Sequence, residues 1–137
     1  MIGPLLRKID AITVRVPDLD AGLTFYRDAL GQPLRWRHDA IGQAAVGLPE
    51  SDTEIVLTTQ HRTEPNWLVA SADEAVATVQ ASGGRLLAPA FDIPVGRIAV
   101  VADPFGNTLV LIDLSKGIYL TDADGTVTDV GEVEKKP

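Results

Sequence analysis

The chain has 137 residues, no cysteine and a formal net charge of −7, with 45% hydrophobic and 23% charged residues. The length suits a single folded domain, and the missing cysteines exclude disulfides, thiolate zinc sites and a cysteine nucleophile. The excess of acidic side chains argues against nucleic acid as a partner, because such binding depends on Lys and Arg neutralising phosphates.

The chain shows no sign of a membrane segment or of a leader. No apolar run approaches the roughly 18 residues that a membrane-spanning helix needs. The first eight residues lack a charged region followed by an apolar stretch and a cleavage site. We therefore expect a cytoplasmic protein with no membrane partner.

The first half of the chain has the pattern of a strand, a helix and three strands. Residues 9–16 are rich in β-branched side chains, which indicates a strand. Asp18 is placed to cap a helix that Gly31 would end. The apolar stripe of that helix is expected at Leu19, Leu23, Tyr26 and Leu30. The three strands are expected near residues 34–38, 43–48 and 54–59.

The second half repeats this order after a short linker at residues 60–66. A strand begins at residues 67–70, and Ser71 with Glu74 forms a capping box at the start of a helix. Strands are expected near residues 85–87, 97–102 and 108–113. The turn-rich residues 103–107 suit a tight hairpin between the last two of these strands.

The remaining residues, 115–137, lie outside both repeats. Two short β-prone stretches, 119–121 and 126–128, flank the turn-forming sequence Asp-Ala-Asp-Gly. The sequence therefore predicts an additional C-terminal hairpin.

Two motifs resemble the glyoxalase, bleomycin-resistance and extradiol-dioxygenase proteins, the vicinal oxygen chelate superfamily. The first runs from Val14-Arg-Val-Pro-Asp-Leu-Asp-Ala to Phe25-Tyr-Arg-Asp-Ala-Leu-Gly, and the second is Asp103-Pro-Phe-Gly-Asn-Thr-Leu-Val-Leu-Ile-Asp. The resemblance implies an α+β fold of two βαβββ units, about residues 8–60 and 66–114, which form cupped mixed sheets around a ligand cavity. The chain would be one such domain with a C-terminal extension at 115–137, and it would pair as a homodimer.

The resemblance also locates the four positions at which the family's metal enzymes hold their ion. In this sequence those positions are occupied by Ala11, Val56, Trp67 and Val110. None of these side chains offers the imidazole, carboxylate or amide donor that a divalent ion needs. We therefore expect no metal and no other cofactor. A displaced site built on Glu54 and a histidine is the alternative.

Strand alternation and the resemblance together predict a mostly apolar pocket lining with a few polar groups. The candidate ligand-binding residues are Ala11, Thr13, Arg15, Trp36, Glu54, Val56, Thr58, Trp67, Val69 and Val110. Each of the two tryptophans either stacks on a flat or cationic ligand or fills space as a packing residue.

Two classes of function follow for such a pocket. The first is a metal-independent protein that binds a small molecule, for example to sequester an antibiotic. The second is a lyase, isomerase or dioxygenase of the same fold, with a displaced metal or with Glu54 or His38 as a general base. The four apolar positions favour the first class, because the usual mechanisms of the second rely on a metal ion.

Overall fold

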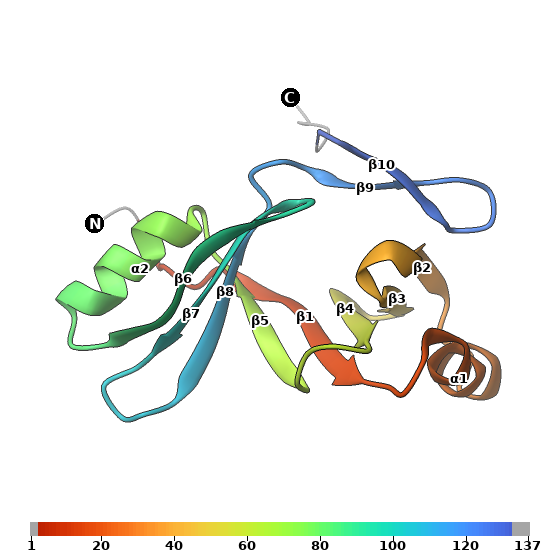
Figure 1. Cartoon of the computed structure of the whole chain (residues 1–137), viewed down its shortest axis with the longest axis horizontal. Helices are drawn as coiled ribbons and strands as arrows, with labels where there is room; N and C mark the ends of the chain where they lie inside the picture. The colour runs from red at the N-terminus through yellow and green to blue at the C-terminus, as the bar shows by residue number, and fades with distance from the viewer. Residues whose placement is uncertain (1–2, 133–137) are drawn as a thin grey trace. The chain divides into compact units, whose positions relative to one another are not determined.

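The computed structural model describes residues 3–132, so the last five residues of the expected extension lie outside it. No helix within that range is long and apolar enough to cross a membrane. The elements in chain order (Figure 1) are β1 (Lys8–Arg15), α1 (Leu19–Leu23), the π-helical turn η1 (Thr24–Ala29), β2 (Leu34–His38), the 3-10 turn η2 (Asp39–Ile41), β3 (Gln43–Leu48), β4 (Ser51–Thr58), β5 (Glu64–Leu68), α2 (Ala72–Ala81), β6 (Arg85–Ile93), β7 (Gly96–Ala102), β8 (Thr108–Asp113), β9 (Ile118–Thr121) and β10 (Val127–Gly131).

These elements form two compact units. We call residues 10–65 with 119–129 the N-terminal unit, and residues 3–9, 66–118 and 130–132 the C-terminal unit. The N-terminal unit holds strands in the order β2-β3-β4-β1, and the C-terminal unit holds them in the order β5-β8-β7-β6. In each unit the first strand runs parallel to the last, and the other pairs are antiparallel. The expected α+β fold with repeated βαβββ order and a C-terminal hairpin is confirmed.

The first helix starts as predicted and then changes its pitch. The side chain of Asp18 accepts a hydrogen bond from the Ala21 N–H at 2.7 Å and caps α1. From Thr24 the helix widens into a π-turn, in which the Leu30 N–H donates to the Phe25 carbonyl at 3.0 Å. The wider turn rotates the apolar stripe, so Leu30 is 53% exposed and the prediction that it packs on the sheet is wrong.

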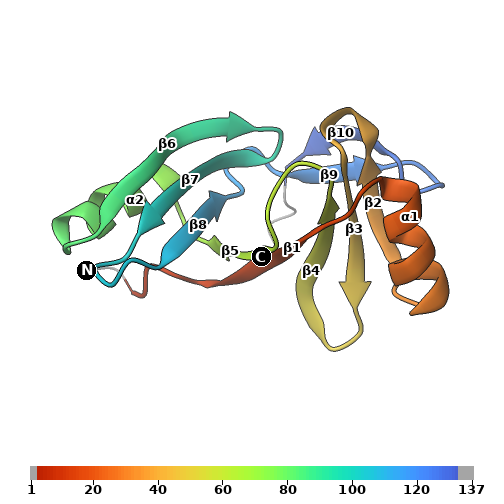
Figure 2. The ribbon, with the colours of Figure 1, turned by 60° about the horizontal axis from the view of Figure 1, so that its bottom comes forward.

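The sheet of the N-terminal unit has two covered faces. On one face Leu19 and Leu23 of α1 pack with Leu57 and other buried residues of the strands. On the other face Trp36 forms a cluster with three small or branched residues, against which Tyr119 of β9 and Val127 of β10 pack. Figure 2 shows the β9–β10 hairpin beside strands β2 and β3. We call this second side of the sheet the hairpin face.

The C-terminal unit packs α2 against one face of its own four strands (Figure 1). The Ser71 side chain accepts a hydrogen bond from the Glu74 N–H at 3.2 Å, which confirms the predicted N-cap. Beneath the helix lies an apolar core to which the helix contributes three buried side chains. The buried members of this core are Val69, Ala72, Ala75, Val76, Ala99, Val101 and Leu111.

Some strand boundaries differ from those expected. The strand β5 starts at Glu64, inside the predicted linker, although residue 65 is a proline. The strand β6 continues to Ile93, well beyond the three residues expected, because its pairing with β7 accommodates two register shifts. Local sequence patterns do not reveal such long-range pairing.

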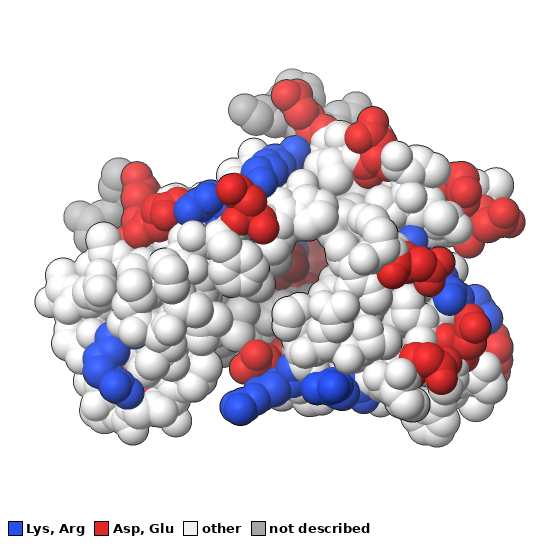
Figure 3. All heavy atoms as spheres, viewed as in Figure 1, with Lys and Arg blue, Asp and Glu red and all other residues white. Residues whose placement is uncertain are grey.

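Charged side chains are spread over the surface rather than gathered by sign. On the face shown in Figure 3, acidic groups are interspersed with small groups of basic ones, and no continuous basic surface appears there.

Candidate ligand-binding site

The hairpin face gathers most of the predicted site residues of the N-terminal unit. Strands β1 and β4 lie side by side in a register that pairs Ala11 with Glu54 and Thr13 with Val56. Because side chains alternate along a strand, these residues point to the same side of the sheet. Trp36 joins them from β2 through its contacts with Ala11 and Val56.

Trp36 contacts both the apolar residues and the Glu54 carboxylate of the hairpin face. The side chain is buried, and its ring centroid lies 4.6 Å from that of Tyr119. Its Nε1–H donates to Oε1 of Glu54 at 3.1 Å. The indole is thus a packing residue that also holds a carboxylate in place at the edge of the cluster.

The residue before Trp36 lies in an irregular part of β2. The pairing of β2 with β3 shifts between Leu34 and Trp36, which leaves Arg35 as an extra, bulged residue. Its side chain lies over Gly47 of β3, where a Cβ atom would overlap the guanidinium group. Gly47 therefore provides the space that Arg35 occupies.

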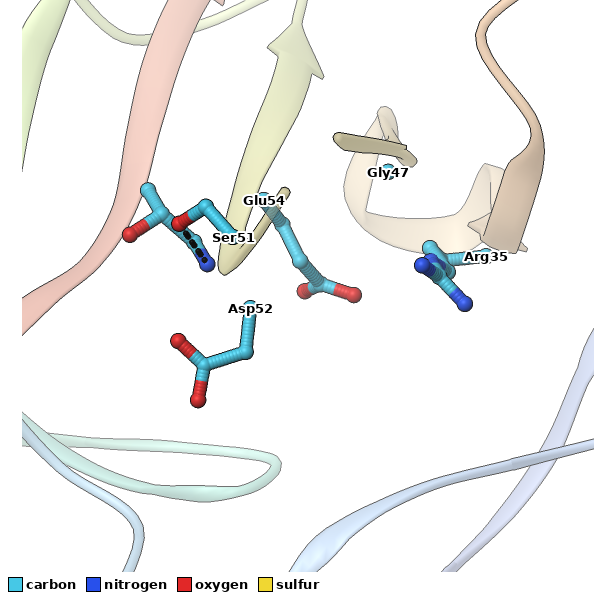
Figure 4. A pocket seen from close by; sticks show the side chains of 6 residues that line it. Arg35, Gly47, Ser51, Asp52 and Glu54 are labelled. Atoms are coloured by element: carbon cyan, nitrogen blue, oxygen red, sulfur yellow. Dashed lines mark hydrogen bonds between the residues drawn. The ribbon is translucent and has the colours of Figure 1, made fainter. Parts of the chain in front are cut away.

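A hollow of about 250 Å³ opens at this point (Figure 4). The lining of the hollow is polar and consists of one arginine, two carboxylates, two hydroxyl groups and a glycine. These residues are Arg35, Gly47, Ser51, Asp52, Thr53 and Glu54. We call this feature the Gly47 hollow. In Figure 4 the carboxylate of Glu54 points across it toward Arg35.

Arg35 differs from the neighbouring arginine of the same strand. Arg37 is held by two ion pairs, with Asp20 and Asp39, each at 2.9 Å. These carboxylates also raise the pKa of Arg37 through hydrogen bonds, that of Asp39 first. Arg35, by contrast, is exposed and forms no ion pair within residues 3–132. It is a cation beside a hollow, with its hydrogen-bond donors available.

Three other predicted site residues serve the loop that follows β4. The Thr13 hydroxyl donates to the Arg62 carbonyl and accepts from the Glu64 N–H. The Thr58 hydroxyl accepts from two N–H groups of the loop, at residues 60 and 61. Arg15 is exposed at the end of β1. The structure places these three away from the Gly47 hollow.

In the C-terminal unit two predicted site residues lie on a different face from the one expected. Trp67 and Val69 both pack into the core beneath α2, beside Leu111. The residue opposite Val110 is Asn66, which is buried. The expectation that Trp67 and Val69 share a face with Val110 is therefore wrong, because alternation along β5 turns them to the helix side.

The residues at the family's metal positions do not fit a divalent ion. In the N-terminal unit Ala11 and Val56 are buried in an apolar cluster and offer no donor atom. In the C-terminal unit Val110 offers none, and the nearby amide of Asn66 is a single ligand. Across residues 3–132, no three histidine, aspartate or glutamate side chains come together in a way that would hold a metal. The displaced site considered from the sequence therefore finds no support among these residues.

His38 lies at the hairpin rather than in the Gly47 hollow. Its ring meets Tyr119 edge-on, with centroids 5.6 Å apart, and the side chain is half-buried. Of the two residues considered as a general base, only Glu54 lines the hollow.

Burial raises the pKa of Tyr119 to about 12. The neutral phenol is favoured in the folded state, so its contribution to stability is complete below the ordinary value of 10.0 and declines as pH rises toward 12. We expect an ultraviolet titration to show one of the two tyrosines ionising only near pH 12. Loss of this late transition in Tyr119→Phe would assign it, and a wild-type titration without any transition near pH 12 would mean that the hairpin does not cover the ring.

Five residues of the Gly47 hollow were not predicted: Arg35, Gly47, Ser51, Asp52 and Thr53. A glycine within a strand indicates a bulge or a close approach of another group, and this signal was available at Gly47. Nothing local marks the bulge at Arg35. The role of Tyr119 depends on where the C-terminal hairpin packs, which the sequence does not show.

The comparisons with known proteins agree with this architecture. The sequence profile of the glyoxalase/bleomycin resistance protein/dioxygenase superfamily matches residues 8–111. No curated protein matches the chain significantly. The chain belongs to the glyoxalase/bleomycin resistance protein/dioxygenase superfamily.

Several solved structures share the fold. The chain is similar to methylmalonyl-CoA epimerase from Mycobacterium tuberculosis, with 21% identity, a TM-score of 0.64 and coverage of 82% of this chain and 91% of that one. It also resembles a variant of Streptomyces coelicolor methylmalonyl-CoA epimerase in complex with 2-nitronate-propionyl-CoA, with 21% identity, a TM-score of 0.60 and coverage of 79% and 97%. A hypothetical protein from Bacillus halodurans has 18% identity, a TM-score of 0.58 and coverage of 77% and 93%.

Proposed function

We propose that this protein binds a small organic molecule on the hairpin face of its N-terminal unit, without a metal ion. The observation that carries the proposal is the Gly47 hollow. There the guanidinium of Arg35 lies across from the Glu54 carboxylate, which the Trp36 N–H holds at the edge of the apolar cluster. Polar groups that converge on a concave surface are typical of a ligand site. Sequestration of the ligand is the role that such a site supports.

Purified protein is expected to contain much less than one zinc, nickel, manganese or iron per chain. The reason is that the positions Ala11, Val56 and Val110 supply no donor atom. Elemental analysis after purification without chelator measures this directly. A stoichiometric ion that disappears in Glu54→Ala would contradict the proposal, whereas an ion retained in that variant would place a metal elsewhere.

The fluorescence of the two tryptophans can show in which unit a ligand binds, because each unit contains one of them. Trp36 contacts Glu54 of the hollow, and Trp67 lies beneath α2 in the other unit. A ligand of the proposed site should change the emission of Trp67→Phe protein and leave that of Trp36→Phe protein nearly unchanged. The reverse pattern would place binding outside the hairpin face.

A second function is an enzyme that uses acid–base chemistry without a metal. It is favoured by Glu54, a carboxylate held in the hollow by the Trp36 N–H, and by the presence of epimerases among the similar structures. A general base of this kind would remove a proton next to a carbonyl group. The test is deuterium exchange into methylmalonyl-CoA in heavy water, with wild type and Glu54→Gln. Exchange that is lost in Glu54→Gln would favour the enzyme over the binding protein.

A homodimer and a cytoplasmic location stay predictions. Light scattering on the purified chain gives the mass in solution and decides between monomer and dimer.

A further inference from the structure

The C-terminal hairpin, formed by β9 and β10, covers the apolar part of the hairpin face. Its side chains Tyr119 and Val127 pack on a cluster in which Trp36 is accompanied by two alanines and a valine. Because these three companions are small, they leave a place for a flat ring above the sheet, and the ring of Tyr119 lies there. A ligand that reaches this cluster must therefore take the place of Tyr119.

The hairpin lies beside β2 as a layer of its own (Figure 2). Within residues 3–132 its two strands form a separate two-stranded sheet, which meets β2 at an isolated bridge between Arg37 and Thr126. There the Arg37 N–H donates to the Gly125 carbonyl at 2.8 Å. A two-stranded hairpin is marginally stable without the surface on which it packs. The hairpin is thus a cover laid on the sheet rather than a further strand pair of it.

The Tyr119 ring is held by packing rather than by a hydrogen bond. The side chain is half-buried, and its hydroxyl group forms no hydrogen bond within residues 3–132. Its ring plane is tilted by 50° against that of Trp36, at a centroid distance of 4.6 Å. Aromatic pairs prefer an offset-stacked or an edge-to-face arrangement. A ring without a backbone attached is free to adopt either arrangement on Trp36, and so it competes with Tyr119 for this place.

Two glycines stand where the hairpin joins the rest of the chain. Gly117 directly precedes β9 with φ +129°, and Gly131 is the last residue of β10. The two approach so closely that a Cβ atom on Gly117 would overlap the Gly131 carbonyl. Hinges are a few residues at the ends of elements, often small ones, that absorb a large change of φ and ψ. The pair therefore forms a hinge about which the hairpin is able to turn.

Building on the proposed function, we propose that the C-terminal hairpin is a hinged cover and that Tyr119 occupies the place of an aromatic ligand. When the hairpin turns away at Gly117 and Gly131, the planar ring of a small phenol or a similar molecule packs against Trp36. The binding step is non-covalent. Closure and ligand binding exclude each other, so the apparent affinity rises with the fraction of molecules in which the hairpin is open.

A reversible lock tests this exclusion within one protein. The chain has no cysteine, so Arg37→Cys combined with Thr126→Cys allows a single disulfide across the isolated bridge. Paired residues of neighbouring strands lie within the Cα separation that a disulfide needs. The probe is p-cresol, which has the ring and the hydroxyl group of the tyrosine side chain, and isothermal titration calorimetry measures its affinity for the full chain. The oxidised variant should bind p-cresol at least about tenfold more weakly than the same variant after reduction.

Two glycine variants separate the cover from general backbone strain. Gly125 has φ +84°, and a Cβ atom there would press on Leu34 of β2. Gly125→Ala should therefore loosen the docked hairpin and raise the affinity for p-cresol at least about threefold. The matched control is Gly106→Ala, because Gly106 has φ +90° but nothing within 4 Å of an added Cβ, and it lies in the turn between β7 and β8. This control should bind p-cresol like wild type.

The hinged cover requires both the loss on oxidation and a gain in Gly125→Ala that Gly106→Ala lacks. Equal affinities of the oxidised and reduced protein, or equal shifts in the two glycine variants, would overturn it. Binding of p-cresol by Tyr119→Ala alone would overturn it too, because Tyr119 would then fill its place permanently, and so would no binding by any of these proteins. None of these results removes the proposed function, which fails only if no compound in a broad fluorescence screen gives a response that depends on Trp36.

Discussion

Replacement of Asp113 by alanine is expected to lower the free energy of unfolding by about 3–5 kcal/mol. Asp113 ends β8, is 3% exposed and is the only buried acidic side chain among residues 3–132. Its carboxylate accepts hydrogen bonds from the N–H groups of Ala72 at 2.7 Å, Arg97 at 3.0 Å and Ser115 at 3.2 Å. The variant leaves three backbone donors in a poorly hydrated place without their acceptor.

Urea unfolding followed by far-ultraviolet circular dichroism measures this loss. The control is Asp92→Asn, which removes an exposed carboxylate of the same unit that pairs with Arg97 and Lys116. Exposed ion pairs contribute little, so the control should unfold close to wild type. A loss in Asp113→Ala no larger than in the control would show that the carboxylate does not join α2, β7 and β8.

The pH dependence of Asp113 provides an independent check. Burial raises the pKa of this carboxyl group, but the hydrogen bonds from Ala72, Ser115 and Arg97 outweigh burial and leave it below the ordinary value of 3.8. A lowered pKa in the folded state means stability that is present above pH 3.8 and is lost as pH falls through the folded pKa. The stability difference between wild type and Asp113→Asn should therefore stay constant near neutral pH and narrow in acid.

The fold was predictable because its local signals agree with one another. The Asp18 and Ser71 caps, the β-branched alternation in β1 and the turn between β7 and β8 each carry their own physical cause. The positions of Ala11, Val56 and Glu54 on one face follow from strand alternation alone. For this reason the sequence alone predicted that the metal positions of the N-terminal unit are apolar.

The features of the site that the sequence did not predict depend on strand bulges and register offsets, or on contacts between segments far apart in the chain. A single residue of offset in β5 moved Trp67 to the helix side, because the period of a strand is two. The bulge at Arg35 interrupts the alternation of side chains along β2. The contact of Tyr119 with Trp36 joins segments more than eighty residues apart, and no local pattern encodes it.

Replacement of Trp36 by alanine is expected to cost about 3–5 kcal/mol of unfolding free energy, the usual range for a large aromatic residue in a core. The variant removes the indole from between the apolar cluster and Tyr119, and it deprives Glu54 of its N–H donor. Trp36→Phe keeps an aromatic ring beside Tyr119 and loses mainly the N–H, so it should cost about 1–2 kcal/mol.

A double-mutant cycle separates the packing contribution of Trp36 from its hydrogen bond to Glu54. If the indole positions Glu54, the combination of Trp36→Phe with Glu54→Gln should be less destabilising than the sum of the single changes, because the second change removes a contact that is already lost. Leu120→Ala, an exposed residue of the same hairpin, serves as the control for packing and should be nearly neutral. Strict additivity in the cycle would mean that Trp36 only fills space. A coupling of about 1 kcal/mol would mean that the indole, besides packing in the apolar cluster, holds the Glu54 carboxylate at the edge of the hollow.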